Sequence, residues 1–209
     1  MALDPARLFA VLAHELRAPI GVARGYLRLL QQGNPRMDDA RATYVTHALG
    51  ALERLAGLVD ETSELARLLG GELGLVRTPC SVPVVLADSL TSLGDRASRV
   101  ALAAGDDLVV DADRSRLSAA LAALIEGVVR AQTAGATVQV SWARAGADAV
   151  ITMTGPRARV RSGRSPAASA PGTGAIRAEI VVSLHGGRLD EARRADGAVH
   201  GVVVHLPLA

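Results

Sequence analysis

The chain has 209 residues, of which 49% are hydrophobic and only 2% aromatic, and its formal net charge is +2. This length and apolar content predict one or two folded domains with cores of leucine, valine and alanine, and so small a charge leaves no electrostatic footprint for nucleic acid. The single cysteine, Cys80, excludes an internal disulfide framework and favours a reducing, cytoplasmic location. No uncharged apolar stretch approaches the roughly 18 residues of a membrane span.

The N-terminal part of the chain predicts two long helices. Apolar residues recur every three or four positions over residues 6–32 and again over residues 39–69, as on one face of a helix, while Gly33 to Asp38 predict a turn and a restart. Two long helices joined by a short loop predict an antiparallel hairpin, and its apolar stripes imply a second copy, hence a dimeric four-helix bundle. The stripe residues are Phe9, Leu12, Leu16, Ile20, Ala23, Leu27 and Leu30, then Val45, Leu49, Leu52, Ala56, Val59, Thr62, Ala66 and Leu69.

Beyond residue 76 the pattern changes to short elements. Residues 155–174 are rich in Gly, Pro, Ser and Arg and predict a mobile loop. The remaining elements predict a mixed α/β layer, so that the whole chain is an α+β protein with domains at 1–76 and 77–209. Helices are expected at 81–93, 113–132 (with Asp113 as N-cap) and 175–187, and strands at 99–104, 107–112, 136–143, 146–155, 187–192 and 197–208.

His14 lies at an unusual place on the first predicted helix. At the helical rotation it is about 200° from both Leu12 and Leu16, so it points away from the apolar stripe. A zinc motif is excluded, because the helical H-E-x-x-H pattern requires histidine where Ala18 stands. An exposed imidazole can accept a phosphoryl group at neutral pH, and the neighbouring Glu15 can orient its tautomer or act as a base. Pro19 removes a backbone donor and predicts a bend just beyond the acceptor.

The segment "HELRAPI" at residues 14–20 resembles the H-box of sensor histidine kinases, whose pattern is close to H-E-L-R-T-P-L. The resemblance continues in order along nearly the whole chain. The family's N-box corresponds to "DADRSRLSAALAALIEGVVRA", its first glycine box to "VITMTGPRARV", and its second to "GTGAIRAEIVVSLHGGRL". The resemblance implies a dimerisation and phosphoacceptor hairpin followed by an ATP-binding domain of the kinase type, with His14 as the phosphoacceptor and Glu15 beside it.

Several departures from that pattern affect the nucleotide site. Gly127 stands where the family has a magnesium-binding asparagine, and Ala122 or Ala123 stands at another asparagine position. Met153, followed by Thr154, takes the place of the aspartate that accepts from the adenine amino group, and Arg157 replaces a glycine. Only Gly155, Gly172 and Gly174 remain as vestiges of the glycine boxes, with spacing altered by Ala175 and Arg177. Losing the adenine acceptor costs about 1–3 kcal/mol, and losing a metal ligand weakens neutralisation of the triphosphate. ATP binding is therefore predicted to be lost, and no metal or cofactor site is predicted.

These features together predict a histidine phosphotransferase of a phosphorelay, resembling the kinase-like phosphotransferases of the sporulation type. The partners would be receiver domains, including that of a hybrid kinase, which supply the Mg²⁺, and no nucleic acid or membrane is expected. The receiver-docking face is predicted from helical phase and from the small residues that permit close approach. It comprises Arg17, Ala18, Gly21, Arg24 and Arg28. Ala18 lacks the hydrogen-bonding group that some family members use to dephosphorylate receivers.

Two alternatives stay open. One is an active kinase core with misaligned ligands, for which Asp111 and Asp113 are the acidic candidates, although Asp113 also suits a helix cap. The other is a non-catalytic pseudokinase scaffold that only binds a kinase or a response regulator. Nucleic-acid binding through Arg157, Arg159, Arg161 and Arg164 is disfavoured, since that stretch lacks aromatic residues for base stacking. His47, His185, His200 and His205 are expected to be structural.

Overall fold

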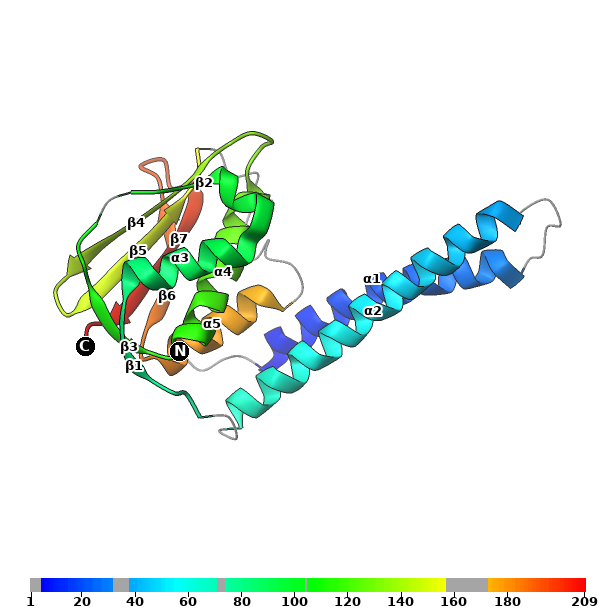
Figure 1. Ribbon diagram of the computed structural model, residues 1–209, viewed down its shortest axis with the longest axis horizontal. Helices are drawn as coiled ribbons and strands as arrows, with labels where there is room; N and C mark the ends of the chain where they lie inside the picture. Colours follow the sequence, from blue (N-terminus) through cyan, green and yellow to red (C-terminus); the bar gives the residue numbers. More distant parts are fainter. Residues whose placement is uncertain (1–4, 32–37, 71–73, 104, 157–172) are drawn as a thin grey trace. The chain divides into compact units, whose positions relative to one another are not determined.

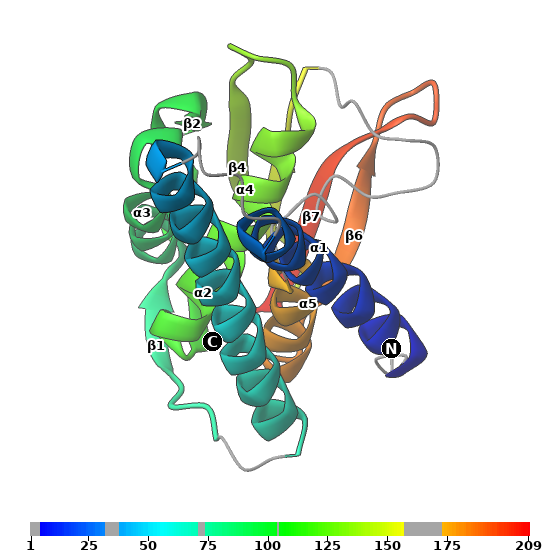
Figure 2. The same ribbon diagram turned by 90° about the vertical axis from the view of Figure 1, so that its right-hand side faces the viewer.

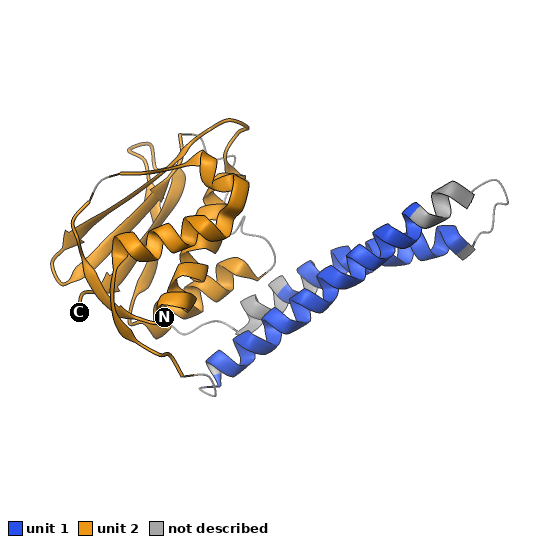
Figure 3. Cartoon of the chain, viewed as in Figure 1, with its two compact units in different colours: residues 1–73 blue, residues 74–209 orange. Residues whose placement is uncertain are grey.

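The computed structural model describes residues 5–31, 38–70, 74–103, 105–156 and 173–209 (Figure 1). The chain divides into two compact units, residues 1–73 and 74–209 (Figure 3). In the first unit, α1 spans Pro5–Gln31 and α2 spans Asp38–Leu69, and the two run alongside each other as a hairpin (Figures 1 and 2). The predicted hairpin is confirmed, and α1 continues as a helix through Pro19, whose side chain is buried.

The seam between the two helices is built from small and aliphatic side chains. Leu12 and Ala23 of α1 are buried, as are five residues of α2. The alanines among them let the helix backbones approach closely. The buried α2 residues are Ala48, Ala51, Leu58, Leu65 and Leu68. Four residues of the predicted apolar stripe on α2 remain exposed beside this seam in the single chain: Val45, Leu49, Leu52 and Val59.

The second unit is a five-stranded sheet with helices on one face. The strand order is β2-β4-β5-β7-β6, with β2 parallel to β4 and every other pair antiparallel. The strands are β2 Val100–Leu102, β4 Val138–Ala145, β5 Asp148–Thr154, β6 Arg188–Arg193 and β7 Val199–Pro207. Alternating burial along β4 and β5 sends one set of side chains toward the helices. At the predicted β4–β5 hairpin, Gly146 takes the positive φ of 64° that the turn requires.

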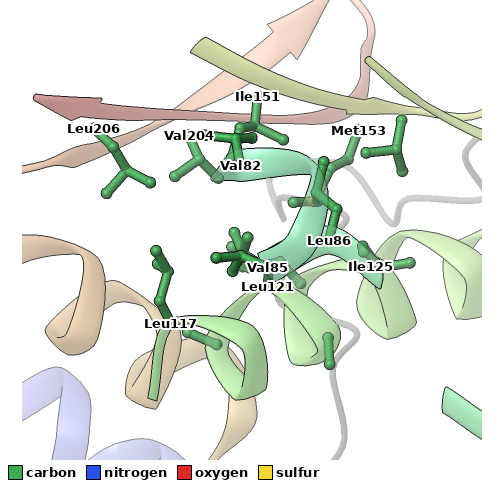
Figure 4. Close-up of a cluster of buried hydrophobic side chains, with 14 of the residues drawn as sticks. Val82, Val85, Leu86, Leu117, Leu121, Ile125, Ile151, Met153, Val204 and Leu206 are labelled. Atoms are coloured by element: carbon green, nitrogen blue, oxygen red, sulfur yellow. The ribbon is translucent and has the colours of Figure 1, made fainter. Parts of the chain in front are cut away.

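Three helices cover the sheet: α3 Val82–Leu93, α4 Arg114–Ala131 and α5 Gly174–Leu184 (Figure 1). Their apolar faces meet the inner sides of β4, β5 and β7 in one core, in which Leu86, Leu121 and Ile125 lie near Ile151 and Met153 (Figure 4). The α+β class and these helices are confirmed. Two elements were missed, the strand β1 Thr78–Ser81 and the 3-10 helix Gly94–Arg99. β1 pairs with β3, Val109–Ala112, in a separate two-stranded sheet.

Candidate functional site

The predicted phosphoacceptor lies in the first half of α1. His14 belongs to the helix, but its side chain falls outside the described residues, and Glu15 beside it is half-buried. All five residues of the predicted docking face are exposed: Arg17, Ala18, Gly21, Arg24 and Arg28. A β-carbon added at Gly21 would meet nothing within 4 Å, so the chain's own packing does not require glycine there. The outward surface of α1 is thus open and carries three arginines.

One flank of the hairpin carries exposed apolar side chains from both helices. Four exposed apolar residues lie on one flank of α2, because each follows a seam position of the heptad by one residue. They are Val45, Leu49, Leu52 and Val59. In two antiparallel right-handed helices, Ile20 and Leu27 of α1 fall on this same flank. These two are also exposed, so that apolar side chains of both helices remain uncovered on this flank in the single chain.

An aromatic cluster that sequence reasoning missed lies between α1 and α2. His47 of α2 stacks on Tyr26 of α1, with ring centroids 4.9 Å apart, and Tyr44 lies 5.6 Å from Tyr26. Both tyrosines of the chain are therefore in this cluster. Local sequence gives no sign of it, because the contact depends on how α1 and α2 align across the loop. His47, expected to have only a structural role, packs against the other helix.

The position of the family's adenine acceptor lies inside the core of the second unit. Met153, near the end of β5, is 0% exposed and is surrounded by apolar residues that include Leu86 and Ile125 (Figure 4). On α4, Gly127 and Ala122 are buried and Ala123 is half-buried, and none of the three offers a metal ligand. The described residues hold no group of three or more His, Cys, Asp or Glu side chains that could bind a metal.

The segment after β5 is held by the chain's own polar groups. A β-carbon at buried Gly155 would lie 2.2 Å from the carboxamide carbon of Gln132, so the glutamine side chain fills the space against this glycine. Arg194 donates to the carbonyl of Gly155 at 3.3 Å and also to that of Pro156. Of the other vestigial glycines, Gly174 is the buried first residue of α5, and Gly172 lies outside the described residues, as does the predicted 157–172 loop with its four arginines.

His200, at the start of β7, adjoins this segment. Its carbonyl accepts from the Gly155 N–H at 3.1 Å, and its ring Nδ1 is buried without a hydrogen-bond partner. No sequence signal pointed to this orphaned nitrogen, and His200 had been expected to be structural. Among the residues that the structure describes, Nδ1 of His200 is the one buried side-chain nitrogen or oxygen atom without a hydrogen-bond partner.

The acidic candidates for a kinase site have other partners. Asp113 is the N-cap of α4, as predicted, and its Oδ1 accepts from the Arg116 N–H at 3.1 Å. Its Oδ2 accepts from the Val76 N–H at 3.2 Å. Asp111 is exposed on β3. His185 lies buried at the end of α5, where its Nε2 accepts from the backbone N–H of Asp113 at 2.9 Å. Both oxygens of Asp113 are thus committed to backbone donors.

Comparison with known proteins covers both units. Residues 6–71 match the family model of the His Kinase A (phospho-acceptor) domain. Two curated relatives are similar along most of the chain. The signal transduction histidine-protein kinase BaeS of Escherichia coli (strain K12) is 25% identical, over 95% of this chain and 46% of its own length. The sensor protein VanS of Enterococcus faecium is 23% identical, over 85% of this chain and 51% of its own. The chain thus spans about half the length of these relatives.

Solved structures share the fold. The Acinetobacter baumannii histidine kinase AdeS superposes with a TM-score of 0.69 at 20% identity, covering 93% of this chain and 98% of that one. The histidine kinase ThkA, in complex with the response regulator protein TrrA, gives a TM-score of 0.66 at 18% identity, covering 97% of this chain and 61% of the other. No helix in the described part of the chain is long and apolar enough to cross a membrane.

Proposed function

Because the chain belongs to the sensor histidine kinase family, we propose that it acts in two-component signalling as a histidine phosphotransferase. His14 takes a phosphoryl group from a receiver aspartate and passes it to another receiver. The nucleotide chemistry of the second unit has been lost. The observation that carries this proposal is Met153, a fully buried thioether at the place of the adenine acceptor.

The transfer needs little from this chain beyond a placed imidazole. The unprotonated ring nitrogen of His14 attacks phosphorus, a P–N bond forms, and the P–O bond to the receiver aspartate breaks, releasing a carboxylate. The proton on the other ring nitrogen can be held or taken by Glu15, and the reverse sequence delivers the phosphoryl group onward. The receiver supplies the Mg²⁺ that neutralises the phosphoryl oxygens. The exposed arginines of α1, Arg17, Arg24 and Arg28, offer positive charge to an acidic partner surface.

The loss of ATP binding follows from two features of the second unit. An adenine amino group placed against Met153 would be left without an acceptor, which costs about 1–3 kcal/mol, or roughly 5- to 150-fold in affinity. Gly127 provides no oxygen for a magnesium ion, so the triphosphate charge would be poorly neutralised. The carboxamide of Gln132 and the guanidinium of Arg194 also occupy the neighbourhood of Gly155.

Assembly as a homodimer completes the proposal. The exposed flank formed by Ile20, Leu27, Val45, Leu49, Leu52 and Val59 is apolar over several helical turns. A surface of this kind is normally covered. A second copy covers it in a symmetric four-helix bundle, and leaves the outward face of α1 open to a receiver.

An active kinase core is the second candidate. The name of one relative favours it, since BaeS is a histidine-protein kinase and is similar to 95% of the present chain. On that reading the chain would bind ATP with other ligands than the family's. A pseudokinase scaffold, which binds a response regulator without accepting phosphate, is the third.

One labelling experiment separates the three candidates. The whole chain is mixed either with γ-labelled ATP and Mg²⁺ or with receiver domains from the same genome that carry labelled phosphoryl groups. Label arriving only from receivers, and lost in His14→Gln, supports the phosphotransferase. Label from ATP establishes the kinase, and no label from either source leaves the scaffold. His47→Gln is the matched control, because it removes a hairpin histidine that packs on Tyr26 and should keep full labelling.

A further inference from the structure

Residues 74–77, where the chain enters the second unit, are attached there mainly by polar contacts, and Leu75 is the one side chain of the four that is half-buried. Val76 is 76% exposed, and Gly74 and Arg77 are exposed as well. Two hydrogen bonds attach the segment. The Val76 N–H donates to Oδ2 of Asp113 at 3.2 Å, and the Arg77 guanidinium donates to the carbonyl of Leu184. With so little buried apolar area, breaking these two contacts removes most of what holds the segment.

Both contacts end at the same place, the meeting point of α4 and α5. Asp113 is the first acceptor, and it is itself fixed by the α4 backbone, because its Oδ1 accepts from the Arg116 N–H at 3.1 Å. Leu184 is the last residue of α5, directly before His185. The Asp113 N–H donates at 2.9 Å to Nε2 of His185, which joins the two helix ends.

The hydrogen bonds of His185 are satisfied by one protonation state only. Its Nδ1 lies 2.7 Å from the carbonyl oxygen of Val181, which can only accept, so Nδ1 must carry a proton. Its Nε2 faces the N–H of Asp113, which can only donate, so Nε2 must be unprotonated. A second proton on the ring would set two N–H groups against each other inside a site that is 4% exposed.

We propose that Asp113 and His185 form a latch that fastens residues 74–77 to the ends of α4 and α5, and that protonation of His185 opens it. The charged groups facing the ring are Arg77 from the entering segment, Asp111 from β3 and Asp113 from the start of α4, with Arg116 paired to Asp113 at 3.5 Å. An imidazolium would push against Arg77 and displace the Asp113 N–H. One protonation event therefore weakens both attachments of the segment.

The sign of the pH dependence follows from burial. Burial lowers the pKa of His185 below its ordinary value of 6.5 and is the largest effect. The hydrogen bond to Val181 raises that pKa, Arg77 lowers it, and Asp113 and Asp111 raise it more weakly. The ring is therefore neutral and the latch closed above pH 6.5. As the pH falls through the lowered pKa, the proton enters, the Asp113 contact is lost and the latch opens. Residues 74–77 then join the connection between the units, adding up to about 3.3–3.6 Å of reach for each residue.

Amide hydrogen exchange of the whole chain, followed by NMR at about pH 7.5 and about pH 5 and corrected for intrinsic exchange, tests the latch. The protection of the Val76 N–H should fall at least roughly tenfold once the pH has dropped about one unit below the lowered pKa of His185, while that of Ile151 in the central strand β5 falls less. His185→Gln keeps one acceptor and one donor but does not titrate, so its Val76 protection should stay constant. Asp113→Ala should leave Val76 unprotected at both pH values.

The controls keep the outcome decisive. Arg144→Ala removes an exposed arginine of β4, away from His185 in the sequence, and should behave as the wild type. If His185→Gln does not fold, Arg77→Ala replaces it. That exposed side chain contributes the contact to Leu184 and a positive charge near His185, and Val76 protection should drop at neutral pH without it. Three outcomes overturn the proposal. In the first, the protection of Val76 in the wild type changes with pH as that of Ile151 does. In the others, it falls equally in His185→Gln, or it persists in Asp113→Ala or Arg77→Ala. None of these outcomes depends on phosphotransfer.

Discussion

Individual side chains distinguish the second unit from the nucleotide-site pattern of the kinase family, and Met153 is the most informative of them. The sequence showed that this residue replaces an acidic one, but not where its side chain points. The structure places it in the core among Leu86 and Ile125, where the thioether is completely buried. A buried methionine adapts to irregular packing and leaves no polar atom to satisfy. The position has therefore become part of the hydrophobic core.

Restoring the acidic residue should harm this protein. Met153→Asp buries a carboxyl group without a charged partner among apolar neighbours, so we expect the free energy of unfolding to fall by roughly 2–5 kcal/mol. Thermal unfolding followed by circular dichroism measures the change. Met153→Leu is the volume-matched control and should cost less than about 1.5 kcal/mol. A variant with aspartate that is as stable as wild type and gains micromolar ATP affinity by calorimetry would show that the nucleotide site is intact.

His185 and Asp113 illustrate what residue-level sequence reading can and cannot reach. The helix cap at Asp113 was predictable, because an aspartate directly before a helical pattern is a local signal. The Asp113 N–H to His185 contact joins residues far apart in sequence and depends on how α4 and α5 pack. Nothing in either local pattern predicts it. The role of Asp113 as acceptor for Val76 was hidden for the same reason.

At the level of elements, α2 shows that periodicity alone does not tell which apolar stripe meets the neighbouring helix. Its residues carry two adjacent apolar stripes, one small and buried against α1, the other larger and exposed. The spacing of apolar residues selects the larger stripe, with Val45, Leu49 and Leu52, and that stripe implies a second copy. The helix was correctly predicted from this pattern. Which stripe meets the neighbouring helix depends on how closely the two backbones approach.

Short elements were harder to predict than long ones. β1 has four residues, includes Pro79 and buries only Cys80, so it lacks the alternation that marks a strand. The two predicted strands at residues 99–104 and 107–112 both exist, yet they belong to different sheets. β2 pairs in parallel with β4, and β3 pairs with β1. Pairing partners that distant in sequence leave no trace in the local pattern of either strand.

Glycines inside α1 give a prediction at the same scale. Gly21 and Gly25 have helical neighbours on both sides, and nothing lies within 4 Å of an added β-carbon at either. Gly21→Ala and Gly25→Ala should each stabilise the chain by about 0.5–1 kcal/mol, since alanine loses less backbone entropy on folding. Chemical denaturation at equilibrium measures both. Gly146→Ala is the contrasting substitution: its φ of 64° is strained for alanine, so that variant should be less stable.

The same glycine substitution also probes docking. Gly21 belongs to the predicted receiver-docking face, so an added methyl group there should slow transfer from a phosphorylated receiver even as the protein gains stability. Stability and transfer rate moving in opposite directions would indicate that the glycine is kept for a close-fitting partner. A rate that is unchanged in Gly21→Ala would remove this residue from the docking face.

For the whole molecule, the apolar flank of the hairpin makes association testable. Leu52 is 46% exposed in the single chain, so Leu52→Glu should disturb the chain's own fold little. In a symmetric dimer both copies lose the burial of a leucine, at about 1.5–3 kcal/mol each, and dissociation should follow. Sedimentation equilibrium should report a monomer. Arg54→Glu, at an exposed position on the opposite flank of α2, should remain dimeric; dissociation of both variants alike would argue against this flank as the interface.

The order of strands in the sheet has a consequence for how the protein is made. β7, close to the end of the sequence, lies between β5 and β6 and is the pairing partner of both. A growing polypeptide leaving the ribosome therefore presents β6 without a neighbour and leaves the apolar inner faces of α4 and β5 partly uncovered until β7 emerges. Pairing of a late strand into the middle of a sheet also slows folding. Distant segments must lose conformational entropy to meet before their contacts can stabilise the sheet. Nascent chains of this protein should accordingly depend on holding chaperones until translation has passed residue 207.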